Sequence, residues 1–282
     1  MTDPLFSVIV PTYDRPALAR EAVDSVLAQT VEDLECIVVD DGSPSALEDS
    51  WGDERVRVVR RDRSGGPSAA RNTGIDGARG RYLAFLDDDD LFVAERLAIA
   101  QEGLQRAPVA LCWGRYEDRS EPARGRMLDG DVRDVIAEGM APAMRLVAVA
   151  RDAAPRFDES FTACEDLEWW FRVAPAAMVA TVPRVGCLVR RHDGARHGTG
   201  TSERIDARLR LLEMYDGYYR AHPRAAAFAW KRVGLMAMAT GRTALARRAL
   251  LRSLRLRPEL RSAWHLARSI PRRTPVQPGR VA

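Results

Sequence analysis

Short apolar, β-branched runs alternate with segments of helical spacing over the first hundred residues, and this alternation constrains the fold most. Residues 15–29 and 67–79 show the helical spacing. Strands and helices in such alternation are typical of a mostly parallel sheet flanked by helices, an α/β fold. Such sheets bind ligands beyond the carboxyl ends of their strands. The runs that predict strands are FSVIV (6–10), LECIVVD (34–40), RVRVV (55–59) and RYLAFL (81–86).

Three of these predicted strands end in polar or acidic residues. The first runs into Pro11-Thr12-Tyr13-Asp14, the second into Asp40-Asp41-Gly42-Ser43, and the fourth into four adjacent aspartates, Asp87–Asp90. Such residues form turns, but four adjacent carboxylates repel one another unless a cation or bound donors neutralise them. Carboxylate oxygens suit Mg²⁺ or Mn²⁺, and Mg²⁺ often bridges carboxylates to substrate phosphates. The quartet therefore favours a metal and phosphate site over a solvated turn.

A glycine turn precedes the aspartate quartet. The segment SGGPSAARN (64–72) places Gly65 and Gly66 at the start of a predicted helix and Arg71 in its second turn. Backbone N–H groups at a helix N-terminus and a nearby guanidinium suit an anion such as a diphosphate. By itself the pattern also fits a loop with a surface arginine, and the neighbouring acids tip the interpretation towards phosphate binding.

These motifs, in this order, resemble the family 2 glycosyltransferases. The resemblance covers residues 5 to about 202 and implies a GT-A, Rossmann-like fold that transfers a sugar from a nucleotide-sugar donor with inversion. Asp14 stands where asparagine is commoner, Asp88 replaces a small residue, and a frequent glycine before Phe157 is missing. The matching segments are VIVPTYDRP, AVDSVLAQT, ECIVVDDGS, GGPSAARNTGIDGARGRYLAFLDDDD, FDESFTACEDLEWWFRV and, more loosely, RRHDGARHGTGTS.

The resemblance assigns nucleotide and metal contacts to individual residues. It implies that Asp40 accepts from a ring N–H of the base, that Asp41 closes that end of the pocket and that Arg71 lies near the base or the diphosphate. Asp87 and Asp89 form the D-x-D pair, the first reaching the ribose and the metal, the second holding Mn²⁺ or Mg²⁺, which would neutralise the departing diphosphate. The residues expected around the nucleotide are Pro11, Thr12, Tyr13, Asp40, Asp41, Arg71 and Asp87.

An acidic pair, Glu165-Asp166, opens a predicted helix over residues 165–173. Local chemistry alone favours acids that stabilise a helix N-terminus. The resemblance instead implies that Asp166 is the general base for the acceptor hydroxyl, with Glu165 as the alternative or supporting group. Apolar neighbours would raise a carboxylate pKa towards the working range. Trp169 and Trp170 fit core packing better than stacking on a sugar.

The segment after the last catalytic motif carries Arg191 and His192 before a Gly- and Thr-rich stretch that ends at Ser202. In relatives a similar segment folds over the diphosphate, so these two side chains are possible phosphate contacts, with a surface or core role equally open. Uridine diphosphate is the expected donor nucleotide, with GDP and dTDP open. The acceptor is expected to be a saccharide or a lipid-linked saccharide.

Charge divides the chain into two parts. Residues 1–202 carry 25 Arg against 35 Asp and Glu, whereas residues 203–282 carry 18 Lys and Arg against 5 Asp and Glu. We expect a catalytic domain over 1–202, a basic appendage over 203–270 that resembles a tetratricopeptide-type helical hairpin, and a disordered tail over 271–282. Arginines along residues 242–257 would form either a solvated face or a contact with an anionic membrane surface. Nucleic acid is a weaker partner, since no binding motif accompanies the charge.

The start of the chain, MTDPLFSVIV, lacks a basic region before its short apolar stretch, and no apolar run approaches the roughly 20 residues that span a bilayer. We therefore expect a cytoplasmic protein, with peripheral attachment at the inner face of the membrane left open. The competing function is an inactive glycosyltransferase-like scaffold that works through its basic tail. The complete set of D-x-D and Glu-Asp acids argues against it.

Overall fold

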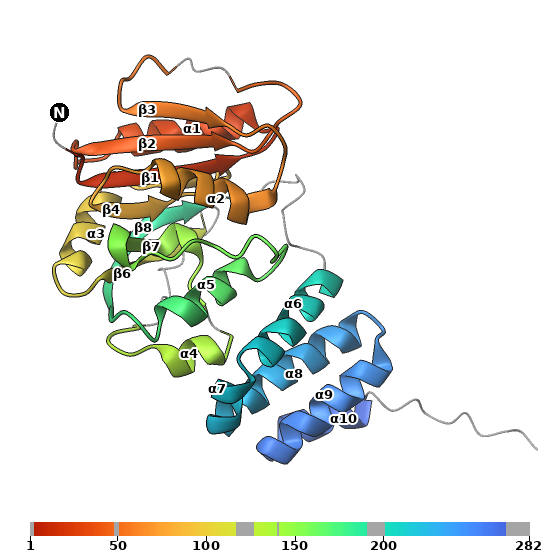
Figure 1. Ribbon diagram of the computed structural model, residues 1–282. Helices are drawn as coiled ribbons and strands as arrows, with labels where there is room; N and C mark the ends of the chain where they lie inside the picture. The colour runs from red at the N-terminus through yellow and green to blue at the C-terminus, as the bar shows by residue number, and fades with distance from the viewer. Residues whose placement is uncertain (1–2, 48–50, 117–126, 140, 191–200, 269–282) are drawn as a thin grey trace, which may run out of the picture. The chain divides into compact units, whose positions relative to one another are not determined.

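The computed structural model describes residues 3–47, 51–116, 127–139, 141–190 and 201–268. The chain divides into two compact units, the first formed by residues 1–136 and 140–199, the second by 137–139 and 200–282. Figure 1 shows the sheet in the first unit and a group of helices in the second. Arg191, His192 and the tail 271–282 lie outside the described residues.

The first unit is built on an eight-stranded sheet in the order β3-β2-β1-β4-β7-β6-β8-β5. Strands β3, β2, β1 and β4 pair in parallel, while β4 with β7, β7 with β6, and β8 with β5 pair antiparallel. Strands β6 and β8 are parallel. The strands are β1 (Phe6–Thr12), β2 (Leu34–Asp40), β3 (Val56–Arg60), β4 (Tyr82–Phe85), β5 (Asp90–Phe92), β6 (Val109–Tyr116), β7 (Val147–Ala150) and β8 (Val179–Val189).

The helices of this unit cover both faces of the sheet because the strands alternate their side chains. On one face, Val8 and Val10 of β1 share a core cluster with Ala22 of α1 and Leu97 of α3. On the other face, a Cβ added at Gly74 of α2 would lie 2.4 Å from Ile9 Cγ2, so only glycine allows α2 to pack this closely. The helices are α1 (Pro16–Leu27), α2 (Gly66–Gly77), α3 (Arg96–Leu104), α4 (Arg133–Ala137) and α5 (Glu165–Val173), with 3₁₀ turns η1 (Met144–Leu146) and η2 (Arg151–Ala153).

The four predicted strands and the predicted helices of the first half are confirmed within a few residues. The predicted α/β class is also confirmed, although the sheet is more mixed than the first hundred residues suggest. The antiparallel strands β7 and β5 come from chain beyond those residues or from the acidic turn itself.

The second unit consists of helices over its described residues. Helices α8 and α9 pack against each other, and a Cβ at Gly234 of α8 would lie 2.7 Å from Leu250 Cγ of α9. Gly241, with φ of +72°, lies in the turn that joins them. No helix among the described residues combines the length and the apolar character needed to cross a bilayer. The helices are α6 (Thr201–Met214), α7 (Asp216–Ala221), α8 (Pro223–Ala239), α9 (Thr243–Leu256) and α10 (Leu260–Arg268).

Candidate active site

The carboxyl ends of β2, β1 and β4 lie side by side because these strands are neighbours in the sheet. Thr12, at the end of β1, donates from its hydroxyl to Asp88 Oδ2 at 2.8 Å. Its backbone carbonyl oxygen accepts from the Asp41 backbone N–H at 2.9 Å. Pro11 is half-buried beside it, and Tyr13 is 47% exposed. The structure thus brings the three predicted strand-end motifs together at one edge.

Asp40 is fully buried, and both of its carboxylate oxygens have protein partners. Oδ1 accepts from the Ser43 backbone N–H and hydroxyl, while Oδ2 accepts from Arg60 Nη1 at 2.7 Å and from the Leu47 N–H at 3.3 Å. Burial alone raises the pKa of Asp40, but the hydrogen bonds from Ser43 and Leu47 and the Arg60 guanidinium outweigh it and hold the pKa below its usual range. In this arrangement Asp40 shapes the loop after β2.

Asp41 organises the glycine turn. Its Oδ2 accepts from the Ser64 hydroxyl at 2.8 Å and from the Gly66 backbone N–H at 2.8 Å, and Arg61 Nε lies 3.1 Å from Oδ1. Asp41 is buried, so these bonds tie the loop after β2 to the start of α2. The turn predicted to approach a phosphate is thereby fixed in place.

Three of the four aspartates after β4 lie close together, and the fourth has other partners. Ligand oxygens of Asp87, Asp89 and Asp90 lie within 4.8 Å of one another. Asp88 instead accepts from Thr12 and lies 3.3 Å from Arg15 Nη1. Burial raises the pKa of Asp90 to about 7, and the charges of Asp87 and Asp89 act in the same direction against Arg145. Three converging carboxylates offer the hard oxygen ligands that Mg²⁺ or Mn²⁺ prefers, so the residues fit such an ion.

Two arginines, one buried and one half-buried, hold these carboxylates. Arg71, 4% exposed, extends from α2 with Nη2 2.8 Å from Asp87 Oδ1. Arg145, on the η1 turn, has Nη1 3.4 Å from Asp87 Oδ2 and Nε 3.2 Å from Asp90 Oδ2. The two guanidiniums therefore contact opposite oxygens of Asp87. Sequence reasoning missed Arg145, since an isolated arginine 58 residues from its partner carries no local signature.

The Glu165-Asp166 pair meets Arg71 from the start of α5. Arg71 Nη1 lies 3.4 Å from Glu165 Oε1 and 3.6 Å from Asp166 Oδ1. That Asp166 oxygen is buried with no hydrogen-bond partner among the described residues. Desolvation by the surrounding protein and the charge of Glu165 raise the pKa of Asp166 to about 7, although Arg71 opposes the shift. Asp166 can therefore exchange a proton near neutral pH.

An aromatic cluster packs beside the Glu165-Asp166 pair and Arg71. Trp169 stacks on Phe157 with ring centroids 5.8 Å apart, and Phe157 also lies under the Arg71 guanidinium at 5.4 Å. Trp169 and Trp170 are completely buried, which confirms core packing for these two side chains. Asn72 accepts from the Phe157 N–H at 2.7 Å, so the segment before α5 is fixed to α2.

Arg190, directly after β8, was also missed by sequence reasoning. Its backbone N–H donates to Asp90 Oδ1 at 3.1 Å, and its Nε donates to the Asp89 carbonyl oxygen at 3.1 Å. Arg190 thus braces the acidic turn from the strand that leads into Arg191 and His192, the two predicted phosphate contacts outside the described residues.

Residues 7–142 match the family described as Glycosyl transferase family 2. This segment is slightly less than half of the chain, and it includes the strand-end motifs, the glycine turn, the aspartate quartet and six of the eight strands, β1 to β6. The segment therefore has the sequence features of that family, as the motifs predict.

A named relative matches a part of the chain of similar length. The Escherichia coli UDP-Glc:alpha-D-GlcNAc-diphosphoundecaprenol beta-1,3-glucosyltransferase WfgD is 34% identical over 122 residues, which cover 42% of this chain and 47% of WfgD. The chain spans less than half the length of the curated relatives it matches. The match and the named relatives confirm the predicted class, a glycosyltransferase, for the segment they cover.

Solved structures extend the likeness in fold to nearly the whole chain. S. aureus TarS 1–349 superposes with a TM-score of 0.67 at 19% identity, covering 94% of this chain and 83% of that one; the same fragment is known in complex with UDP-GlcNAc. The mannosyltransferase PcManGT from Pyrobaculum calidifontis, in complex with GDP-Man and Mn²⁺, gives 0.60 at 20% identity over 95% and 80%. The expected GT-A fold with C-terminal helices is confirmed.

Proposed function

We propose that this chain is an inverting, metal-dependent glycosyltransferase that moves a sugar from a nucleotide-sugar donor to a saccharide or lipid-linked saccharide in glycan or polysaccharide synthesis. One observation carries the proposal: Arg71 joins the Asp87, Asp89 and Asp90 cluster to the Glu165-Asp166 pair at the carboxyl edge of the sheet. A donor-side cation site and an acceptor-side base are the two parts that this reaction requires.

UDP is the nucleotide we expect. The name of WfgD specifies UDP-Glc, and TarS is known with UDP-GlcNAc. GDP remains the alternative, because PcManGT is known with GDP-Man. We assign Pro11, Thr12 and Tyr13 to the base and ribose end of the pocket. Asp40 and Asp41 act there chiefly by fixing the loop after β2 and the glycine turn, and a ring N–H must share the Asp40 carboxylate with its present donors.

Asp89 and Asp87, with Asp90 as an additional ligand, would hold Mn²⁺ or Mg²⁺. Such an ion supplies Lewis-acid neutralisation of the diphosphate leaving group. The protein's own contribution is to converge three carboxylates and to brace them with Arg145 and Arg190. Arg71 also lies within reach of the same region as a phosphate contact, and Arg191 and His192 stay predicted contacts from the following segment.

Asp166 is the proposed general base. Its carboxylate accepts the proton of the acceptor hydroxyl while that oxygen attacks the anomeric carbon from the face opposite the diphosphate, which gives inversion. A pKa of about 7 keeps a large share of Asp166 ionised at neutral pH while leaving it basic enough to take the proton. Glu165 supports it by raising that pKa, and it is the alternative base.

We assign this chemistry to residues 1–202 and propose a basic appendage over 203–270, with the α8–α9 pair as a hairpin of the tetratricopeptide type.

The proposed function is tested by thermal unfolding of the full chain with UDP, GDP, dTDP, CDP or ADP, with and without Mn²⁺, beside Asp89→Ala. A ligand at a hundredfold excess over its Kd adds about 2.7 kcal/mol to the free energy of unfolding. We expect one nucleotide to act only with metal and Asp89. A metal-dependent shift with no sugar transfer from any donor would favour the scaffold alternative.

A further inference from the structure

Helix α10 carries an apolar stripe on its exposed side. Leu260, Ala263, Trp264 and Ala267 follow the spacing i, i+3, i+4 and i+7, which places them on one face of the helix. All four are exposed, Leu260 by 93% and Trp264 by 53%. In a globular domain such a stripe usually faces the core, so its exposure indicates a binding surface for a membrane or another molecule.

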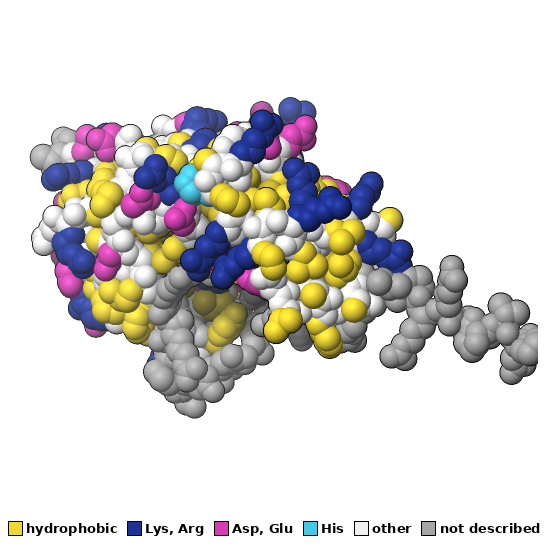
Figure 2. Space-filling model, turned by 90° about the horizontal axis from the view of Figure 1, so that it is seen from below, with side chains coloured by type: hydrophobic (Ala, Val, Ile, Leu, Met, Phe, Trp, Pro, Cys, Tyr) yellow, Lys and Arg dark blue, Asp and Glu magenta, His cyan; other side chains and the backbone are white. Residues whose placement is uncertain are grey.

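Helix α9, which packs against α10, presents arginines on its exposed side. Arg248, Arg252 and Arg255 are exposed at i, i+4 and i+7, whereas Ala249 and Leu250 are buried on the opposite face. Figure 2 shows hydrophobic side chains gathered on the C-terminal helices with Lys and Arg side chains beside them. We call Arg248, Arg252, Arg255, Leu260 and Trp264 together the appendage surface.

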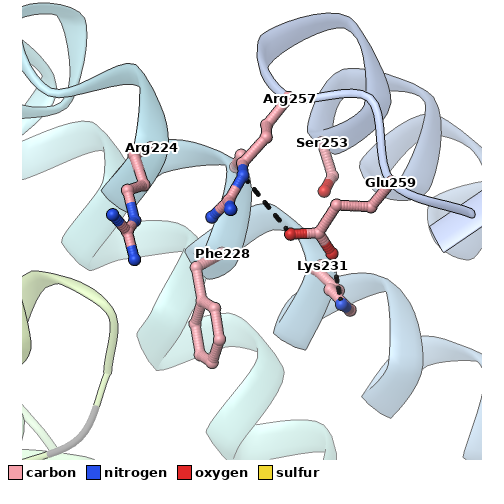
Figure 3. Close-up of a pocket in the computed structure, with 7 residues that line it drawn as sticks. Arg224, Phe228, Lys231, Ser253, Arg257 and Glu259 are labelled. Atoms are coloured by element: carbon pink, nitrogen blue, oxygen red, sulfur yellow. Dashed lines mark hydrogen bonds and ion pairs between the residues drawn. The ribbon is translucent and has the colours of Figure 1, made fainter. Parts of the chain in front are cut away.

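The positive charge of this part of the chain is almost uncompensated within its own sequence. Residues 223–268 contain eleven Lys and Arg residues and one acid, Glu259. That acid is engaged in the pocket of Figure 3, where its carboxylate lies 2.7 Å from Lys231 Nζ and 3.5 Å from Arg257 Nε. Glu259 therefore does not neutralise the arginines of the appendage surface.

Charge narrows the choice of occupant. A second copy of this surface would set arginines against arginines, and the remaining chain, residues 269–282, contains three arginines and no acid. An occupant must instead be anionic and must also accept leucine and tryptophan side chains. A bilayer with anionic headgroups has both properties at its interface, where tryptophan is favoured and each nearby cation adds attraction.

We propose that the appendage surface binds an anionic lipid bilayer, with Leu260 and Trp264 in the headgroup region and the arginines of α9 against the headgroups. The proposal rests on the proposed function, because it would bring the catalytic unit to a lipid-linked acceptor. It names the partner of the appendage, which the active site itself does not specify.

Flotation of the full chain with vesicles tests the proposal. We expect binding to vesicles of phosphatidylglycerol mixed with phosphatidylcholine, and little binding to phosphatidylcholine alone or at high salt. The double variant Leu260→Ser/Trp264→Ser should lower the partition coefficient at least tenfold, roughly, and Arg248→Ala/Arg255→Ala about twenty-fivefold, since each cation near the lipid contributes about fivefold. Met178→Ser, which removes a side chain 55% exposed in the first unit, should bind as the parent chain does.

Lipids brominated in the acyl chain provide a second readout, because they quench tryptophan fluorescence at the interface. The parent chain should be quenched and Trp264→Phe should lose that quenching, with unchanged thermal unfolding as the folding control. Equal binding to both vesicle types, no binding at all, or quenching that survives Trp264→Phe would each overturn the proposal. Absence of binding would leave an acidic protein as the partner to seek, whereas surviving quenching would place a different tryptophan at the bilayer. Two crossed measurements separate a failure of this proposal from a failure of the proposed function. Leu260→Ser/Trp264→Ser should keep the nucleotide-induced rise in thermal stability, and Asp89→Ala should still float with anionic vesicles.

Discussion

Arginine has two different environments in the two units of this protein. In the first unit, Arg71 is buried and Arg145 is half-buried, and each lies within 3.6 Å of two or more carboxylates. In the second, Arg248 and Arg255 are exposed in a stretch whose one acid is already paired elsewhere. The same side chain therefore serves internal structure in one unit and is available for an external anion in the other.

This difference indicates which arginines stabilise the fold and which are available for binding. A buried guanidinium loses its hydration, and only its carboxylate partners restore that loss, so removing either side leaves an unpaired charge. An exposed guanidinium keeps its water and contributes little to folding. We therefore expect changes near Arg71 to alter activity and stability together, and changes on α9 to alter binding alone.

The largest effect should come from Asp89→Ala. The change removes a predicted metal ligand and leaves Asp87 and Asp90 to their arginine partners, so nucleotide binding in Mn²⁺ and turnover should both fall. We expect kcat/KM to drop by about a thousandfold or more, as for the loss of a main electrostatic contact to the leaving group. Sugar transfer and nucleotide titration measure it. Asp24→Ala, an exposed acid on α1, is the matched control, and normal turnover by Asp89→Ala would remove the metal assignment.

Asp166→Asn should stop transfer while donor binding persists. General-base contributions are typically about a hundredfold to ten-thousandfold, and we expect about a thousandfold in kcat. Because the base must be ionised and its pKa is raised to about 7, the rate of the parent enzyme should fall about tenfold per pH unit below that value. The pH profile of Asp166→Asn should lose this limb. Parent-like turnover would shift the role to Glu165, for which Glu165→Gln is the companion variant.

Arg71→Met should unfold more easily and should change the pH profile. Arg71 is enclosed between Asp87, Glu165 and Asp166, so its loss should lower the free energy of unfolding by about 3–5 kcal/mol. Arg71 also lowers the pKa of Asp166. Without it the ionised form is less favoured, and the acid limb of the rate should move to higher pH. Urea unfolding and rate profiles measure the two effects; Arg71→Lys, which keeps the charge, should recover part of both, and an unchanged limb would contradict the pairing.

Contiguous patterns in the sequence were sufficient to predict the helices and strands that form the candidate active site. Helix α5 spans the predicted residues 165–173, and the strands that end in acids were recognisable because their apolar runs and turn residues are adjacent in the chain. Contacts between distant segments were not accessible in this way. Arg145 meets Asp87 only because β7 pairs with β4, and no local signal predicts that pairing.

The sequence also did not show which hydrogen-bond donors would bind the carboxylates of Asp40 and Asp41. Asp40 and Asp41 are followed by small turn residues, and either could have faced a ligand directly. In the folded chain, Ser43, Arg60 and the glycine turn occupy their oxygens because the loops after β2 and β3 converge there. The exposed stripe on α10 shows the same limit, since helical spacing predicts an apolar face but not whether the fold covers it.

The smallest effect on stability should come from Arg248→Ala, and it gives the sharpest contrast with Arg71→Met. Arg248 is exposed on α9, so the free energy of unfolding should change by less than about 0.5 kcal/mol. Partition onto anionic vesicles should nevertheless weaken about fivefold, because one cation leaves the lipid-facing side. Urea unfolding and flotation of the same preparation separate the two quantities. A stability loss comparable to that of Arg71→Met would mean that Arg248 belongs to the folded interior, and the distinction between the two sets of arginines would then fail.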